Sequence, residues 1–166
     1  MHNINRPYSP DSDTADFLYK NYLLLCTAPP SISKWGRQLG LESIASCKSS
    51  WRVIGISEAA LRDIAAAGKR TDQQRGHWYP RETRYGKLFG EEELDRDAFI
   101  SFFFEHDTTV IVTKAQNNKD CDHSTWGRII PVEEGLFPLS GYVFGVRKKT
   151  EVPWGRQRVA ELDVGA

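Results

Sequence analysis

The order in which helical and β-rich segments follow one another most constrains what this chain can fold into. Helical patterns dominate up to about residue 105, and three β-rich segments joined by short links follow. Consecutive strands with short links pair in antiparallel fashion, and the helices that precede them cover the sheet. The sequence therefore predicts an α+β fold, with an antiparallel sheet of about four strands and helices packed mainly on one face.

The expected strands are short and rich in β-branched and aromatic residues, which favour extended backbone. We expect them over residues 51–56, 108–114, 128–132 and 141–149. Two polar and irregular stretches predict loops, residues 69–79 and 115–127.

The expected helices carry apolar residues at helical spacing. They cover residues 13–27, 35–39, 58–67, 80–89 and 95–105. Asp13 or Thr14 is expected to cap the first helix, and Gly40 is expected to end the second. The third helix is the best defined, because Ser57 can cap its first turn and Gly68 can adopt the left-handed conformation after its last.

The length of 166 residues suits one domain with one core. Residues 1–12 are polar and without periodicity, so we expect a flexible N-terminal arm there. A single α+β domain is expected over residues 13–158. Residues 159–166 are expected to form a C-terminal tail or a short terminal helix.

No apolar run approaches the roughly 20 residues that cross a bilayer, and the first residues lack the apolar core of a signal peptide. Three widely spaced cysteines do not indicate a disulfide framework. We therefore expect a soluble, cytoplasmic protein without a membrane partner. No cofactor is expected, because nucleotide-binding glycine motifs are missing from the sequence. No metal is expected either, because Cys121 and His123 lack the paired spacing of a zinc site.

Charge is segregated along the chain, although the 22 basic and 22 acidic residues balance. Residues 69–87 carry six basic and two acidic side chains, and residues 147–158 carry five and one. Between them, residues 91–107 carry seven acidic side chains and one basic one. Either these blocks pair with one another or stay solvated, or the basic blocks form a patch for phosphate groups.

Residues 75–87 hold the side chains best suited to chemistry. If Pro80 opens a helix, Arg81, Arg84 and Tyr85 share one helical face, with His77 just before it. Histidine moves protons near neutral pH, and arginine holds phosphate through paired hydrogen bonds. We therefore expect a catalytic set of His77, Arg81 and Tyr85.

The remaining candidates would bind the phosphates or bases of a nucleic acid. They are Arg75, Trp78, Arg84, Lys87, Lys114, Trp126, Arg147 and Lys148. Each also has a plainer interpretation. His77 can be an ordinary surface residue, Trp78 can pack on the core, and Arg81 and Arg84 can pair with acidic side chains.

A proton-transferring histidine and phosphate-binding arginines are the side chains that metal-independent RNA cleavage requires. A histidine and arginine helix ahead of an antiparallel sheet resembles, in a general way, small metal-independent ribonucleases and ribonuclease toxins. The resemblance implies an endonuclease, a hydrolase of phosphodiester bonds that acts on RNA rather than DNA, although one architecture hosts many functions.

Three alternatives stay open. A non-enzymatic module could bind nucleic acid through the same basic face. The acidic helix over residues 91–107 could bind a protein partner, as in an adaptor or immunity-like factor. A metal-dependent DNA nuclease could use Glu105, Asp107 and Lys114, and Glu105, His106 and Asp107 could form an acid and base set.

Overall fold

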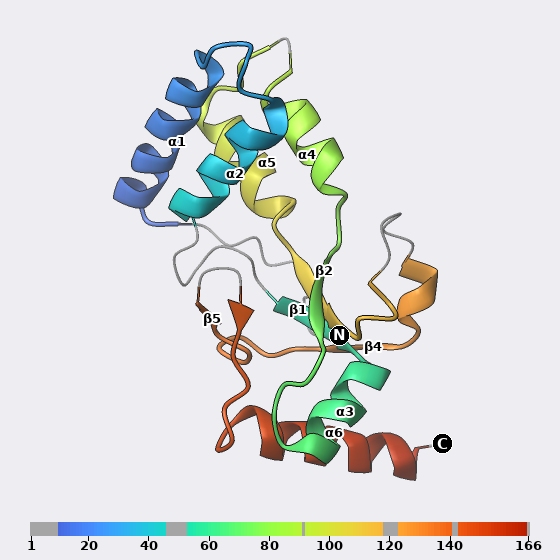
Figure 1. The fold of residues 1–166 in the computed structure, drawn as a ribbon. Coiled ribbons are helices and arrows are strands. Elements are labelled where there is room, and N and C mark those ends of the chain that lie inside the picture. The colour runs from blue at the N-terminus through green and yellow to red at the C-terminus, as the bar shows by residue number, and fades with distance from the viewer. Residues whose placement is uncertain (1–9, 46–52, 91, 118–122, 141–142, 166) are drawn as a thin grey trace. The chain divides into compact units, whose positions relative to one another are not determined.

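A computed structural model describes residues 10–45, 53–90, 92–117, 123–140 and 143–165 of the chain (Figure 1). The chain divides into two compact units. Unit 1 comprises Met1–Arg52 and Tyr79–Thr108, and unit 2 comprises Val53–Trp78 and Thr109–Ala166. Each unit has a hydrophobic core of its own. The single domain expected over residues 13–158 stays a prediction.

The described part of unit 1 is helical (Figure 1). Its core is aromatic, with the rings of Tyr22 and Phe99 stacked at a centroid distance of 4.5 Å and Phe103 against Phe99. Four helices surround this core, namely α1 (Ser12–Cys26), α2 (Lys34–Ala45), α4 (Arg81–Leu88) and α5 (Arg96–Glu105).

The helix boundaries of unit 1 agree with the sequence in part. Helix α4 begins directly after Pro80, as expected. Helix α1 is capped by Asp11, whose carboxylate accepts a hydrogen bond from the backbone N–H of Thr14 at 2.8 Å, so the expected caps lie inside the helix. Helix α2 continues through Gly40 to Ala45, and the expected end was wrong. A Cβ at Gly40 would lie 3.8 Å from the Leu25 side chain, an ordinary van der Waals distance, so this position of α2 faces α1 and can continue the helix.

Unit 2 is built on a four-stranded sheet with the strand order β2-β3-β1-β4. Helix α3 packs against α6 (Figure 1). Its buried residues form one hydrophobic cluster with Ile56 and Ile111, so α3 also packs against one face of the sheet. A second sheet pairs the short strands β5 and β6. The elements are β1 (Val53–Ser57), α3 (Glu58–Ala67), β2 (Gln74–His77), β3 (Thr109–Val112), η1 (His123–Trp126), β4 (Ile129–Pro131), β5 (Leu139–Ser140), β6 (Val143–Phe144) and α6 (Glu151–Val164).

The α+β class and the four-stranded sheet are confirmed, but the sheet is mixed rather than purely antiparallel. Strands β1 and β3 run parallel, whereas β1 with β4 and β2 with β3 are antiparallel. A parallel pair needs a long crossover connection. Residues 58–108 supply it, because they include α3, β2 and the second half of unit 1.

Three local expectations differ from the structure of unit 2. Residues 69–79 were expected to be a loop and contain β2. The strand expected over residues 141–149 is reduced to Val143–Phe144, with residues 141 and 142 outside the described part. Helix α6 extends to Val164, so most of the expected C-terminal tail is helical.

Of the arm expected over residues 1–12, residues 1–9 lie outside the described part, and residue 12 begins α1.

Among the described residues, no helix combines the length and the apolar character needed to cross a membrane.

Candidate functional site

The predicted site residues are divided between the two units, because the boundary between Trp78 and Tyr79 runs through the predicted cluster. Four of them belong to unit 1, namely Arg81, Arg84, Tyr85 and Lys87. The others belong to unit 2, namely Arg75, His77, Trp78, Lys114, Trp126, Arg147 and Lys148. Each group is therefore a candidate site in its own unit.

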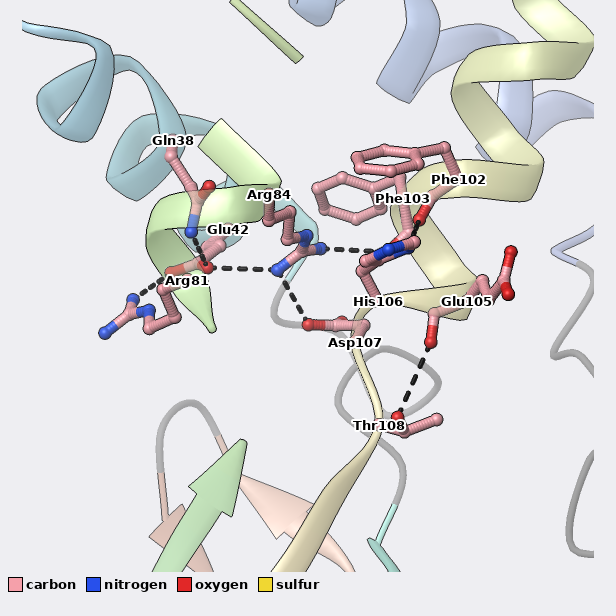
Figure 2. Close-up of polar contacts among 10 residues, drawn as sticks. All are labelled: Gln38, Glu42, Arg81, Arg84, Phe102, Phe103, Glu105, His106, Asp107 and Thr108. Carbon is pink, nitrogen blue, oxygen red and sulfur yellow. Dashed lines mark hydrogen bonds and ion pairs between the residues drawn. The ribbon is translucent and has the colours of Figure 1, made fainter. Parts of the chain in front are cut away.

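Arg84 lies in the core of unit 1, with 1% of its surface exposed. One guanidinium nitrogen donates to Glu42 Oε1 at 3.0 Å and to Asp107 Oδ1 at 2.9 Å (Figure 2). The other terminal nitrogen donates to the carbonyl oxygen of Phe103 at 3.1 Å. A guanidinium group buried between two carboxylates has a structural role, because loss of either partner would leave an unpaired buried charge, and nothing in this arrangement supports the phosphate-binding role expected for Arg84.

Arg81 shares the face of α4 that carries Arg84, as the helical spacing predicts. Its guanidinium group is bonded to Glu42 Oε2 and lies over the ring of Trp35, 4.4 Å from the ring centroid. The ring of Tyr85 meets Trp35 edge-on at 5.9 Å. Arg81 and Tyr85 therefore contact α2 side chains, while Lys87 is exposed.

Sequence reasoning missed Glu42, the carboxylate that both arginines bind. It is fully buried and also accepts a hydrogen bond from Gln38 at 2.8 Å (Figure 2). The available signal was a single acidic residue next to Leu41 in an apolar stretch. Because the helix was expected to end at Gly40, this residue fell outside it.

The three side chains of the acid and base set expected over residues 105–107 have separate surroundings. Asp107 is bound to Arg84, and the side chain of Glu105 is exposed. His106 Nδ1 lies 3.0 Å from the carbonyl oxygen of Phe102, and the imidazole ring packs on Tyr79 at 4.3 Å. Within the described ranges, no three His, Cys, Asp or Glu side chains are grouped as metal ligands would be.

The acidic residues of the 91–107 segment have different roles. Asp95 caps α5 by accepting from the N–H of Ala98 at 2.8 Å. Glu92, Glu93 and Asp97 are exposed. A protein partner at this segment stays a prediction, and residue 91 lies outside the described part.

In unit 2, strand β2 places Arg75 and His77 on one face of the sheet. The β2–β3 register pairs Arg75 with Ile111 and His77 with Thr109, whereas Gly76 pairs with Val110. Side chains alternate along a strand, so the guanidinium and imidazole groups lie two residues apart on the same side. Both side chains are half-buried on a strand at the edge of the sheet.

The opposite face of β2 carries an aromatic cluster. The ring of His123 stacks on Trp78 at a centroid distance of 4.7 Å and contacts Trp126 at 4.3 Å. Trp126 is 2% exposed, and a Cβ at Gly76 would lie 2.6 Å from its ring. Trp126 therefore belongs to the core rather than to an accessible stacking surface, while Trp78 is half-buried.

Gln116 holds this cluster against the sheet through hydrogen bonds to Trp126. Its side-chain amide donates to the carbonyl oxygen of Trp126 at 2.9 Å, and its backbone carbonyl oxygen accepts from Trp126 Nε1 at 3.1 Å. Its Oε1 accepts from Ser57 at 2.7 Å. Lys114 is exposed, but it follows the end of β3 that pairs with Gln74, away from the His77 end.

The two basic candidates near α6 differ in their surroundings. Arg147 is bonded to the buried carboxylate of Glu151, which also accepts from the backbone N–H groups of Arg147 and Phe137 at 2.7 and 3.0 Å. Burial alone would raise the pKa of Glu151, but these hydrogen bonds together lower it below its ordinary value. Arg147 is therefore a structural partner, while Lys148 is exposed.

Comparison with protein-family models, curated proteins and solved structures found no match for this chain.

Proposed function

We propose that this protein binds single-stranded nucleic acid, RNA in preference to DNA, through unit 2. The observation that carries the proposal is the position of Trp78, half-buried directly after edge strand β2 and held by the stacked ring of His123. A nucleobase can stack on an indole that is already fixed, because little side-chain freedom is lost. Stacking of this kind contributes about 1 to 3 kcal/mol per base.

Exposed cations in the same unit supply contacts for the phosphates. Lys114, Arg128 and Lys148 are exposed, and no ion pair within the described ranges involves them. Unit 1 is the poorer candidate, because the arginines predicted to bind phosphate there are bonded to Glu42. Phosphate binding requires guanidinium donors that are not already satisfied by carboxylates.

A second candidate function is metal-independent RNA cleavage, favoured by the placement of Arg75 and His77 on one face of β2. In this version, His77 accepts the proton of the 2′-hydroxyl and the 2′-oxygen attacks the phosphorus. The bond between the phosphorus and the 5′-oxygen breaks, and the 5′-oxygen takes a proton from water. The other product is a 2′,3′-cyclic phosphate. Arg75 would stabilise the negative charge that develops on the phosphate oxygens.

One set of assays separates these functions. Labelled single-stranded RNA and DNA of the same sequence are titrated with the full chain, and binding is followed by fluorescence anisotropy. The RNA samples are then resolved on a gel, with and without EDTA. Binding without strand scission supports the first function, and EDTA-resistant scission that His77→Ala abolishes supports the second. Absence of binding to either strand at low salt overturns both.

A further inference from the structure

Helix α1 is apolar on two opposite sides, which is unusual for a helix at the surface of a compact unit. Leu18 and Tyr22 are buried in the unit 1 core. Phe17 and Leu24, in contrast, are 58% and 68% exposed. A phenylalanine and a leucine in the middle of a solvent-facing side have no role in the core of their own unit.

These two exposed residues lie on a narrow stripe with two charged ones. Asp13, Phe17, Lys20 and Leu24 follow one another at spacings of four, three and four residues, which in a helix of about 3.6 residues per turn keeps them on one line. All four are exposed. In the described part of the chain, neither Asp13 nor Lys20 takes part in an ion pair. The stripe therefore begins with the anion Asp13 and carries the cation Lys20 after its midpoint. Phe17 lies between these two charges, and Leu24 follows Lys20.

We propose that this stripe binds the same stripe of a second copy of the chain, with the two α1 helices antiparallel around a two-fold axis. Such a contact is isologous, so every interaction occurs twice. With the stripes fully overlapped, Phe17 packs beside the stem of Lys20 and near Leu24 of the second copy. The ammonium group of Lys20 then lies within reach of Asp13 of the second copy.

Charge complementarity favours a second copy over other occupants. The stripe carries one anion and one cation, so it matches itself in the antiparallel direction but presents no excess charge to an RNA or to an anionic membrane. The contact area of two 15-residue helices is small, and interfaces below about 1,200 Å² are typically transient. The expected complex is a weak dimer in rapid exchange.

Sedimentation of the full chain over a wide concentration range tests the proposal. The weight-average mass should rise from 18.9 kDa toward twice that value as the concentration increases. Phe17→Glu should keep the protein monomeric at every concentration. Val143→Glu is the matched control, because Val143 is a similarly exposed apolar residue of unit 2 and its replacement should leave the dimer unchanged.

A charge swap tests the orientation independently of Phe17. Lys20→Asp should weaken the dimer about tenfold, a loss of about 1.4 kcal/mol, because it places like charges together. The double variant Asp13→Lys with Lys20→Asp should restore the wild-type dissociation constant. The proposal would be overturned if the wild-type chain were a monomer at all concentrations. It would also be overturned if the double variant dimerised no more tightly than Lys20→Asp alone. Circular dichroism of each variant checks that α1 is retained.

Discussion

At the scale of single residues, the buried cluster of Glu42, Arg84 and Asp107 is the most consequential feature of unit 1. Two carboxylates share one guanidinium group, and all three side chains are almost fully buried. A buried pair adds little compared with apolar residues of the same volume, but loss of one partner leaves a charge in a poorly solvated place. The cluster should therefore tolerate no single replacement.

Glu42→Ala should lower the free energy of unfolding by about 3 to 5 kcal/mol, the usual cost of breaking a buried ion pair. Urea denaturation followed by far-ultraviolet circular dichroism measures this loss. Glu82→Ala is the control, since Glu82 is an exposed acid of the adjacent helix α4 and its loss should change stability by less than about 0.5 kcal/mol. Equal effects of the two replacements would show that Glu42 does not neutralise Arg84.

Glu151 makes the stability of unit 2 depend on pH. Its folded-state pKa is lowered, so the stability that its charge contributes is complete above the ordinary glutamate value of about 4.3. This contribution is lost as the pH falls through the lowered pKa. Glu151→Gln should therefore lower the free energy of unfolding by about 1 to 3 kcal/mol at neutral pH. The difference in free energy of unfolding between the variant and wild type should become smaller below about pH 4.3. A difference that is constant down to pH 3 in urea denaturation would contradict this assignment.

The residue scale also shows which part of the predicted arrangement of side chains the sequence could give. The sequence places Arg81 and Arg84 on one helical face, which the structure bears out through their common partner Glu42. It does not reveal that this face points to a carboxylate about 40 residues away in the chain. Local spacing determines which side chains share a face, whereas tertiary packing determines what that face meets.

At the scale of elements, strand β2 positions Trp78 of the candidate nucleic-acid site directly after its last residue. It pairs with β3 along one edge and carries Gly76 directly beneath the ring of Trp126. Gly76→Ala should push this ring away from the sheet, because the added Cβ would lie 2.6 Å from it. We expect a loss of about 1 to 3 kcal/mol in stability, measured by thermal or urea denaturation together with a change in tryptophan fluorescence.

A glycine of helix α4 provides the matched control. A Cβ at Gly86 would meet no atom within 4 Å, and alanine is the better helix former by about 0.5 to 1 kcal/mol. Gly86→Ala should therefore stabilise the protein slightly. If Gly76→Ala were stabilising as well, the close packing of Trp126 on β2 would be wrong.

The elements that the sequence predicted well are those with local signals. Helix α3 has its expected cap, with the Ser57 hydroxyl accepting from the N–H of Ala60 at 3.2 Å, and ends at Gly68 in the left-handed conformation. Strand β2 has no such signal, because its residues are polar and its stability comes from pairing with β3, more than 30 residues later in the chain. The parallel direction of β1 and β3 was hidden for the same reason.

At the scale of the whole molecule, the balanced charge means that long-range attraction contributes little to nucleic-acid binding. Affinity should then come from a few local phosphate contacts in unit 2. For single strands, each contact adds about 0.7 to the slope of log affinity against log salt concentration. Lys148→Ala or Lys114→Ala should each reduce the slope by about this amount in anisotropy titrations at several salt concentrations.

Lys87→Ala is the control for this prediction, because Lys87 is an exposed cation of unit 1. Its removal should leave the slope unchanged. A slope that falls only with Lys87→Ala would place the phosphate contacts in unit 1 and contradict the proposed location.

The class of fold could be predicted from the sequence because the α+β pattern is spread over the whole chain. The division into units could not, since unit 1 is assembled from residues before and after the first half of unit 2. The cluster predicted over residues 75–87 is therefore divided between the two units, and its catalytic role stays a prediction. Within unit 2, the sequence named Arg75, His77 and Trp78 as candidates but predicted a loop there, whereas the structure places them on strand β2 and directly after it.

The affinity for single-stranded RNA of Trp78→Leu, compared with that of Trp35→Leu, tests the central claim most directly. Trp35 is the matched control, an exposed tryptophan of unit 1. Loss of one stacked base should raise the dissociation constant about tenfold for Trp78→Leu, while Trp35→Leu binds as wild type does. An unchanged dissociation constant for a folded Trp78→Leu variant would contradict the account.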